Sequence, residues 1–135
     1  MDERTLDHIG IAVPSLDEAL PIWESLLGFP GSGRQVVDSQ GAEVVFVGPG
    51  PGRVELLAPT RPDSPVARFL GRRGPGMHHL CYRVADLEGA LAELTAAGHS
   101  PVDPEPRTGA HGHRVVFLHP RTSTGVLIEL LEGRA

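Results

Sequence analysis

A chain of 135 residues, 40% apolar and 21% charged, has the length and composition of one globular domain with its own core. Its net charge of −5, with no basic run, argues against nucleic acid or an anionic membrane as the main partner. Cys81 is the only cysteine, which excludes an internal disulfide and a cysteine-rich metal site. Because no segment resembles a membrane span, a signal peptide or a transit peptide, we expect a cytoplasmic protein without a membrane partner.

The first half of the chain predicts a strand, a helix and three further strands. The strand covers about residues 5–13, and Ser15 with Glu18 three residues later forms the capping box of the helix. Apolar residues recur along that helix at helical spacing: Leu16, Leu20, Trp23 and Leu27. Glycine and proline separate the three strands that follow, near 34–38, 42–47 and 53–58.

The second half predicts the same series of elements after a short linking helix. Ser64 as N-cap and Pro65 at the first helical position indicate that this linking helix covers about 64–73. A strand at 77–84 and a helix from Asp86 come next. Further strands are expected near 100–103, 113–118 and 125–132.

The two halves are copies of one module. The segment "DHIGIAVPSLDEAL" (7–20) aligns with "HHLCYRVADLEGAL" (78–91), and "VVFVGP" (44–49) aligns with "VVFLHP" (115–120), both at an offset of 71 residues. "VELL" (54–57) then matches "IELL" (128–131) after a turn that differs by three residues. The repeat predicts one α+β domain, 1–135, made of two tandem βαβββ modules at about 5–60 and 76–132.

The repeat distinguishes the two adjacent histidines of "GMHHLCYRV". It pairs His79 with His8, and His78 with Asp7. Strand alternation places His8 opposite the apolar face of its strand, on a face otherwise lined by small residues. We therefore expect His79 to face the same cavity as His8. His78 is expected on the helix side or near the strand end, and not as a ligand.

The last strand of each module carries a carboxylate within an apolar run, Glu55 in "RVELLA" and Glu129 in "LIELLE". Burying such a carboxylate is costly unless it is paired or coordinated. One such residue alone is more often structural, but two histidines and two glutamates at equivalent points of two modules predict a four-ligand site. This donor set suits divalent Mn, Co, Ni, Zn or Fe in an open site, whereas a closed structural zinc site normally uses cysteine.

The same motifs resemble the vicinal oxygen chelate superfamily, and more specifically the methylmalonyl-CoA epimerase family. The resemblance covers almost the whole chain, through "DHIGIAV", "SQGAEVVF", "VELLAP", "DSPVARFLGRRGPGMHHL", "RTGAHGHRVVFLHP" and "GVLIELLE". It implies a glyoxalase-like fold in which the two modules form a half-barrel-like cavity. It also implies a divalent metal ion (Co, Mn, Ni or Zn) held by His8, Glu55, His79 and Glu129.

The resemblance further implies the interconversion of (2R)- and (2S)-methylmalonyl-CoA by metal-assisted 1,1-proton transfer through an enediolate. Glu129 would then be both a ligand and the base on one face of the substrate. The second acid/base group is unassigned, because the family position falls on Val44, and Glu43, one residue earlier, points to the opposite face. A homodimer is expected, since sheet edges need cover and related proteins commonly pair.

Other residues and other functions stay open. His111 and Arg114 could contact the substrate, and Arg72 and Arg73 the CoA phosphates, but all four are equally consistent with solvated positions. The alternatives are a glyoxalase-type isomerase or lyase with the same four ligands, and a metal-free small-molecule-binding protein of the same fold. An iron extradiol dioxygenase, with two histidines and one carboxylate, would leave Glu55 without a role.

Overall fold

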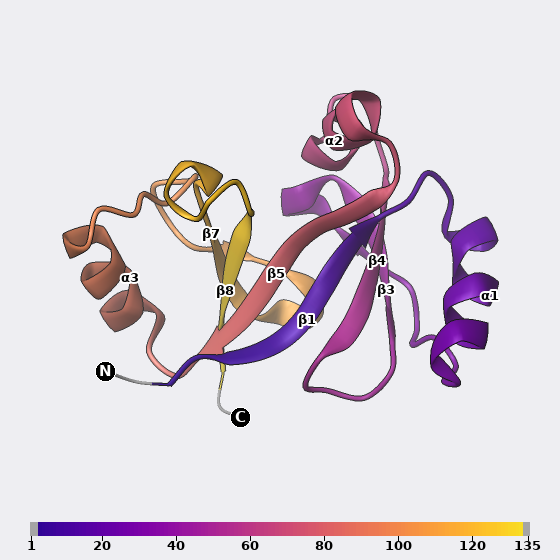
Figure 1. Cartoon of the computed structure of the whole chain (residues 1–135), viewed down its shortest axis with the longest axis horizontal. Helices are drawn as coiled ribbons and strands as arrows, with labels where there is room; N and C mark the ends of the chain where they lie inside the picture. Colours follow the sequence, from indigo (N-terminus) through magenta and orange to yellow (C-terminus); the bar gives the residue numbers. More distant parts are fainter. Residues whose placement is uncertain (1–2, 134–135) are drawn as a thin grey trace.

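The computed structural model describes residues 3–133, which form one eight-stranded sheet with three α-helices outside it (Figure 1). The strands are β1 (Thr5–Ala12), β2 (Gln35–Val37), β3 (Ala42–Val47), β4 (Arg53–Pro59), β5 (Gly76–Val84), β6 (Arg107–Thr108), β7 (Arg114–Leu118) and β8 (Ile128–Glu132). The helices are α1 (Leu16–Leu27), α2 (Pro65–Arg73) and α3 (Leu87–Ala96). The predicted α+β, glyoxalase-like fold is confirmed. Within residues 3–133, no helix is long and apolar enough to cross a membrane.

The strand order is β2-β3-β4-β1-β5-β8-β7-β6, so the two copies of the module meet at the antiparallel pair β1 and β5. Each of these strands pairs in parallel with the last strand of its own module, β1 with β4 and β5 with β8. Four neighbouring strands at the centre of the sheet therefore carry Glu55, His8, His79 and Glu129 in that order. The fold brings together residues up to 121 positions apart.

The helices begin where their capping residues predict. The hydroxyl of Ser15 accepts a hydrogen bond from the backbone N–H of Glu18 at the start of α1, and Ser64 does the same for Ala67 in α2. α1 buries Leu16 and Ala19 against apolar side chains of β3 and β4, including the fully buried Leu56. Burying a leucine of this kind contributes roughly 1.5–3 kcal/mol.

One predicted strand is wrong. Within the segment expected as a strand near 100–103, only Pro101 makes an isolated bridge, with Leu118, and the regular strand is the two-residue β6. Proline has no N–H to give to a ladder, and Pro101, Pro104 and Pro106 interrupt this stretch. The last strand also starts later than expected, because a turn with positive φ at Thr124 and Gly125 precedes it.

The ladder between β1 and β5 contains two irregularities that the alternation argument did not include. Leu6 and His8 lie opposite Tyr82 and Cys81, so that Asp7 is an extra residue on β1. On β5 the extra residue is His78, because Gly10 and Ile11 lie opposite His79 and Met77. A bulge interrupts the period of two and re-aims a side chain. The prediction that alternation turns His78 away from His79 is therefore wrong.

Candidate metal centre

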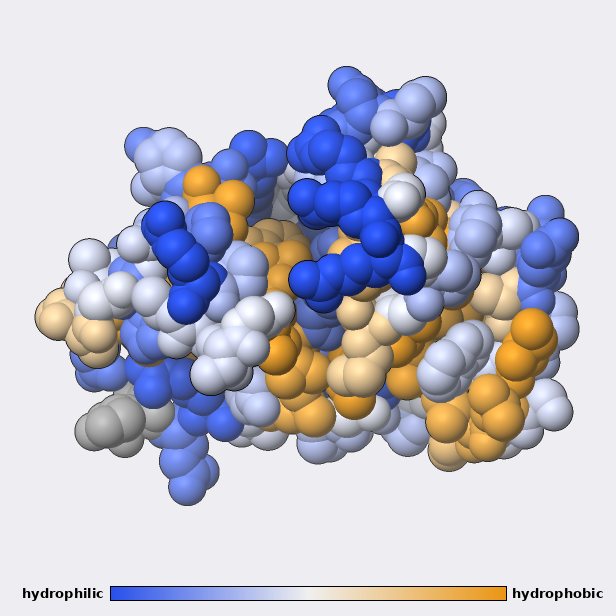
Figure 2. Space-filling model, turned by 45° about the horizontal axis from the view of Figure 1, so that its top comes forward, coloured by the Kyte–Doolittle hydropathy of each residue, from blue (hydrophilic) through white to orange (hydrophobic). Residues whose placement is uncertain are grey.

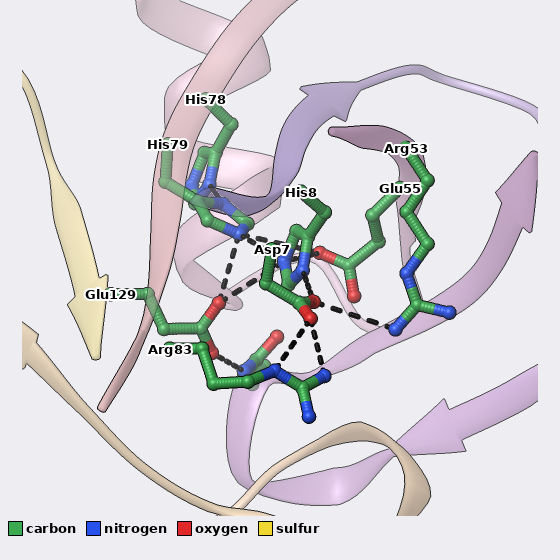
Figure 3. A network of polar contacts seen from close by, with 9 residues as sticks. Asp7, His8, Arg53, Glu55, His78, His79, Arg83 and Glu129 are labelled. Atoms are coloured by element: carbon green, nitrogen blue, oxygen red, sulfur yellow. Dashed lines mark hydrogen bonds and ion pairs between the residues drawn. The ribbon is translucent and has the colours of Figure 1, made fainter. Parts of the chain in front are cut away.

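The side chains of His8, Glu55, His79 and Glu129 converge at the centre of the sheet, and all four are buried (Figure 3). Nε2 of His8 lies 3.2 Å from Nε2 of His79. Oε1 of Glu55 lies 3.3 Å from both of these nitrogens, and Oε1 of Glu129 lies 3.3 Å from that of His8 and 3.1 Å from that of His79. The structure thus brings together all four residues that the sequence selected.

Gly10 leaves open the space that the ring of His79 occupies. The two residues lie opposite each other in the ladder between β1 and β5. A Cβ atom added to Gly10 would lie 2.2 Å from Cε1 and 2.3 Å from Nδ1 of His79. The imidazole therefore lies directly across the backbone of β1, in space that only glycine leaves open.

Asp7 fixes the orientation of His8. Its Oδ2 lies 2.7 Å from Nδ1 of His8, and Arg83 donates from Nε to Oδ1 at 3.2 Å. Arg53 donates to Oδ2 at 3.4 Å. Burial alone raises the pKa of Asp7, but the hydrogen bonds to His8 and Arg83 outweigh it and hold that pKa well below its usual range. An ionised Asp7 that accepts the Nδ1 proton leaves the lone pair of Nε2 of His8 available to a metal ion.

Sequence reasoning missed Asp7 because it assumed regular alternation along the first strand. The usable signal was local, since a carboxylate directly precedes the predicted ligand His8 in "DHIGIAV". A carboxylate that orients a ligand histidine is a common companion of metal sites. Only the bulge, which sequence periodicity does not reveal, lets two successive side chains meet.

The two buried carboxylates of the cluster need a positive charge near them. Burial alone lowers the pKa of an imidazole, yet hydrogen bonds to Glu129 and Glu55 raise the pKa of His79 to about 9. The pKa of His8 is also raised against burial, with Asp7 as the first cause. Burial alone raises the carboxylate pKa, but the adjacent imidazoles lower that of Glu129. With neutral imidazoles the four side chains carry two negative charges, which one divalent ion would neutralise.

The donor atoms fit a metal ion for a second reason. Two Nε2 atoms face each other at 3.2 Å, and two lone pairs at that distance repel unless a proton or a cation lies near them. Oε1 of Glu55 is buried and faces both Nε2 atoms at 3.3 Å in poor hydrogen-bond geometry, a costly condition for a carboxylate oxygen. Donor atoms of His8, Glu55 and His79 lie within 4.8 Å of one another. These residues could hold a divalent ion, with Glu129 beside them.

Gln40 connects the other oxygen of Glu129 to the first module. Its Nε2 donates to Oε2 of Glu129 at 3.4 Å, across 89 positions of sequence. The turn that carries Gln40 needs Gly41, whose φ is +58° and whose Cβ would lie 2.7 Å from Cβ of Ser64. The "SQG" motif was part of the family resemblance, but sequence reasoning gave Gln40 no role.

A pocket of about 370 Å³ adjoins the cluster through His78. Figure 2 shows a hollow between the two halves of the molecule, with hydrophobic side chains inside it and hydrophilic ones along its edge. Its apolar lining includes Val66, Val102, Val115, Val116, Phe117 and Leu127. Its polar lining is Ser39, Gln40, Arg61, Asp63, Arg68, His78, Asp103 and Arg107.

The other residues proposed as substrate contacts lie outside this pocket lining. Arg72 and Arg73 are exposed at the C-terminal end of α2, with Arg73 over the ring of Phe69. Arg114 is exposed and pairs with Glu88 and Glu132. The ring of His111 lies 5.1 Å from that of Phe46 and contributes no atom to the pocket lining.

The alternation expected for Val44 and Glu43 agrees with their positions on β3. Val44 is buried in the core that also contains Phe46, whose ring lies 5.2 Å from that of His8. Glu43 is partly exposed, and Nη1 of Arg34 lies 3.9 Å from its carboxylate. β3 therefore presents apolar side chains to the cluster.

The chain is similar to known proteins over most of its length. Residues 7–117 match the model of the Glyoxalase/Bleomycin resistance protein/Dioxygenase superfamily. The human mitochondrial methylmalonyl-CoA epimerase is 40% identical over 126 residues, which cover 93% of this chain and 72% of the human protein. The chain belongs to the methylmalonyl-CoA epimerase family. Solved structures of that family have the same fold over nearly the whole chain.

Two of these structures illustrate the likeness. The methylmalonyl-CoA epimerase of Mycobacterium tuberculosis superposes with a TM-score of 0.90 at 37% identity, covering 97% of this chain and 89% of that protein. A methylmalonyl-CoA epimerase in complex with methylmalonyl-CoA and NH4+ superposes with a TM-score of 0.92 at 34% identity, covering 99% and 97%. This family membership agrees with the resemblance that the sequence motifs indicated.

Proposed function

We propose that the protein is an isomerase that interconverts (2R)- and (2S)-methylmalonyl-CoA by moving the α-proton between the two faces of the substrate. The observation that carries the proposal is the convergence of His8, Glu55, His79 and Glu129 beside a pocket, in a chain of the methylmalonyl-CoA epimerase family. The α-carbon of this substrate lies between a thioester carbonyl and a carboxylate, so that its proton is acidic enough for a positioned base to remove.

The same four residues are the proposed ligands of one divalent metal ion. The facing Nε2 atoms, the poorly satisfied Oε1 of Glu55 and the two negative charges that the cluster carries with neutral imidazoles support this assignment. When bound, the ion supplies Lewis acidity that stabilises the negative charge developing on the substrate oxygens. The nitrogen and oxygen donors suit Co, Mn, Ni or Zn, and metal analysis of the purified protein identifies which. His8→Ala and His79→Ala should each lose stoichiometric metal.

Glu129 is the proposed base on one face. It is buried, and its lowered pKa keeps it ionised at neutral pH, ready to accept a proton. Gln40 holds its second oxygen, which restricts rotation of the carboxylate. On the side of β3, Val44 and Phe46 cannot transfer a proton and Glu43 is near Arg34 instead, so β3 supplies no second carboxylate.

The pocket beside the cluster is the proposed site of the acyl-CoA. Arg61, Arg68 and Arg107 are the cationic members of its lining, and we assign the CoA phosphates to them in place of Arg72 and Arg73. Cationic guanidinium groups bind phosphate well. Arg107→Ala should raise the KM for methylmalonyl-CoA, while Arg72→Ala, at an exposed position outside the pocket lining, serves as the matched control.

A homodimer in the cytoplasm is the proposed state of the protein. Ile22, Leu26 and Phe29, in α1 and just after it, are exposed apolar side chains, and a second chain would cover them. The single buried thiol of Cys81 fits a reducing compartment. Sedimentation equilibrium at micromolar concentration should give twice the monomer mass of 14.4 kDa, and a single mass at the monomer value would refute the dimer.

The reaction itself is tested with one stereoisomer. Metal-loaded protein is mixed with (2S)-methylmalonyl-CoA, and appearance of the (2R) epimer is followed by circular dichroism until the signal reaches the constant value of the epimer mixture. Conversion of the glutathione hemithioacetal of methylglyoxal, without conversion of methylmalonyl-CoA, would replace this proposal by glyoxalase chemistry. Binding of the acyl-CoA without either reaction would make the protein a binding protein.

A further inference from the structure

His78 is the extra residue of the bulge on β5, and its ring lies between the metal centre and the pocket. Its Nδ1 is 2.9 Å from Nδ1 of His79. The ring of Phe69, from α2, meets it edge to face at 5.0 Å and limits its rotation. The side chain also belongs to the lining of the pocket. The ring of His78 therefore contacts a proposed ligand, His79 (Figure 3), and also belongs to the wall of the pocket.

The first module contains the counterpart of this contact. Asp7 is the extra residue of the bulge on β1, and it contacts Nδ1 of His8 at 2.7 Å. Asp7 and His78 are equivalent in the repeat, as are His8 and His79. Each proposed ligand histidine thus has its Nδ1 held by the bulged residue directly before it. The two modules use different side chains, a carboxylate and an imidazole, for this contact.

The contact between the two adjacent histidines determines where their protons lie. Nε2 of His79 points at His8 and the two carboxylates, and a ligand nitrogen carries no proton. The proton of neutral His79 is then on Nδ1, which donates to Nδ1 of His78. A neutral His78 that accepts at Nδ1 carries its own proton on Nε2. Within residues 3–133, Nε2 of His78 has no hydrogen-bond partner and is not among the buried unsatisfied atoms.

We propose that His78 has two functions, one for each ring nitrogen. Through Nδ1 it positions the ligand His79, and through Nε2–H it donates a hydrogen bond to an acyl oxygen of the substrate in the pocket. The proposal rests on the metal site and the epimerase activity proposed above. It makes His78 a positioning residue for the metal and a specificity residue for the acyl group, without making it a ligand.

Two substitutions test the roles of Nδ1 and Nε2 of His78 separately. The amide of asparagine reaches about as far from the backbone as Nδ1 of histidine, and that of glutamine about as far as Nε2. His78→Asn should keep the Co²⁺ dissociation constant within about threefold and raise the KM about fivefold, for the loss of one hydrogen bond. His78→Gln should raise that constant by about 10- to 100-fold and keep the KM at saturating Co²⁺. His99→Gln, at a half-buried position outside the cluster and the pocket, should change neither quantity.

Co²⁺ is titrated by its visible absorption, which does not depend on activity. If the wild type binds no Co²⁺, the proposed metal site fails, whatever His78 does. If the wild type binds Co²⁺ and both variants keep its dissociation constant and KM, the inference about His78 is refuted alone. A reversed pattern, with asparagine weakening the metal and glutamine spared, refutes the assignment of the two nitrogens.

A measurement on the unmodified protein covers the case in which a variant fails to fold. Long-range proton–nitrogen NMR of the ¹⁵N-labelled, Zn²⁺-loaded protein reports which nitrogen of each histidine bears the proton. The expected result is Nδ1–H for His79 and Nε2–H for His78. A proton on Nδ1 of His78, or a doubly protonated His78 at neutral pH, would overturn the proposal.

Discussion

Gly10→Ala should abolish binding of the proposed metal ion without replacing any of the four proposed ligand residues. The new Cβ would lie 2.2 Å from Cε1 of His79, whereas ordinary contact begins at 3.4 Å, so the ring or the strand must move by about 1.2 Å. Metal–ligand distances tolerate only about 0.2 Å, so a displacement of this size takes His79 out of the ligand set. Forcing a side chain into a packed site also costs about 1–3 kcal/mol of stability.

The control is Gly71→Ala, the same change on an exposed turn of α2, where nothing lies within 4 Å of the new Cβ. It should retain the metal and gain up to about 1 kcal/mol, because alanine favours the helix. Both variants are dialysed with excess metal and then against buffer, and metal per chain is determined by mass spectrometry. If Gly10→Ala keeps one tightly bound ion and the wild-type melting temperature, the ring of His79 does not cross β1 at this position.

Three further changes test the surroundings of the cluster. Asp7→Asn should weaken metal binding about 10- to 100-fold in a metal titration, because the negative charge that holds Nδ1 of His8 is lost. An unchanged metal affinity would make Asp7 a purely structural partner of Arg83. Glu43→Gln should change stability by less than about 0.5 kcal/mol and leave turnover nearly unchanged, whereas a large loss of turnover would place this carboxylate in the site. Cys81 should resist a thiol reagent at pH 8 in the native protein and react once the protein is unfolded, because burial raises the pKa of its thiol to about 12. Rapid labelling of the native protein would show instead that the core around Cys81 is open.

The internal repeat predicted the two βαβββ modules and selected the four residues of the cluster, whereas the glyoxalase-like fold came from the family resemblance. A period of 71 residues identifies equivalent positions in two modules, and a carboxylate within an apolar strand is costly enough to indicate a partner. Neither argument needs the order of the strands in the sheet. The structure adds that order, in which β1 and β5 are neighbours and place His8 beside His79.

Sequence periodicity failed where the strands are irregular. Alternation placed His78 away from His79 and indicated no role for Asp7, but bulges between β1 and β5 re-aim both side chains toward the proposed ligand histidines. A bulge depends on pairing with a distant strand, so the local sequence does not encode it. The contact between Gln40 and Glu129 spans 89 positions and was invisible for the same reason.

The measurement that tests the central claim most directly is hydrogen exchange at the α-carbon of methylmalonyl-CoA. Metal-loaded wild type and Glu129→Gln are incubated with the substrate in deuterium oxide, and loss of the α-proton signal is followed by NMR. The wild type should exchange the proton rapidly. Glu129→Gln keeps an oxygen near the cluster but cannot accept a proton, so it should exchange about 10² to 10⁴ times more slowly. Exchange by the metal-loaded variant at the wild-type rate would contradict the assignment of Glu129 as the base, and no exchange by the wild type would contradict the epimerase itself.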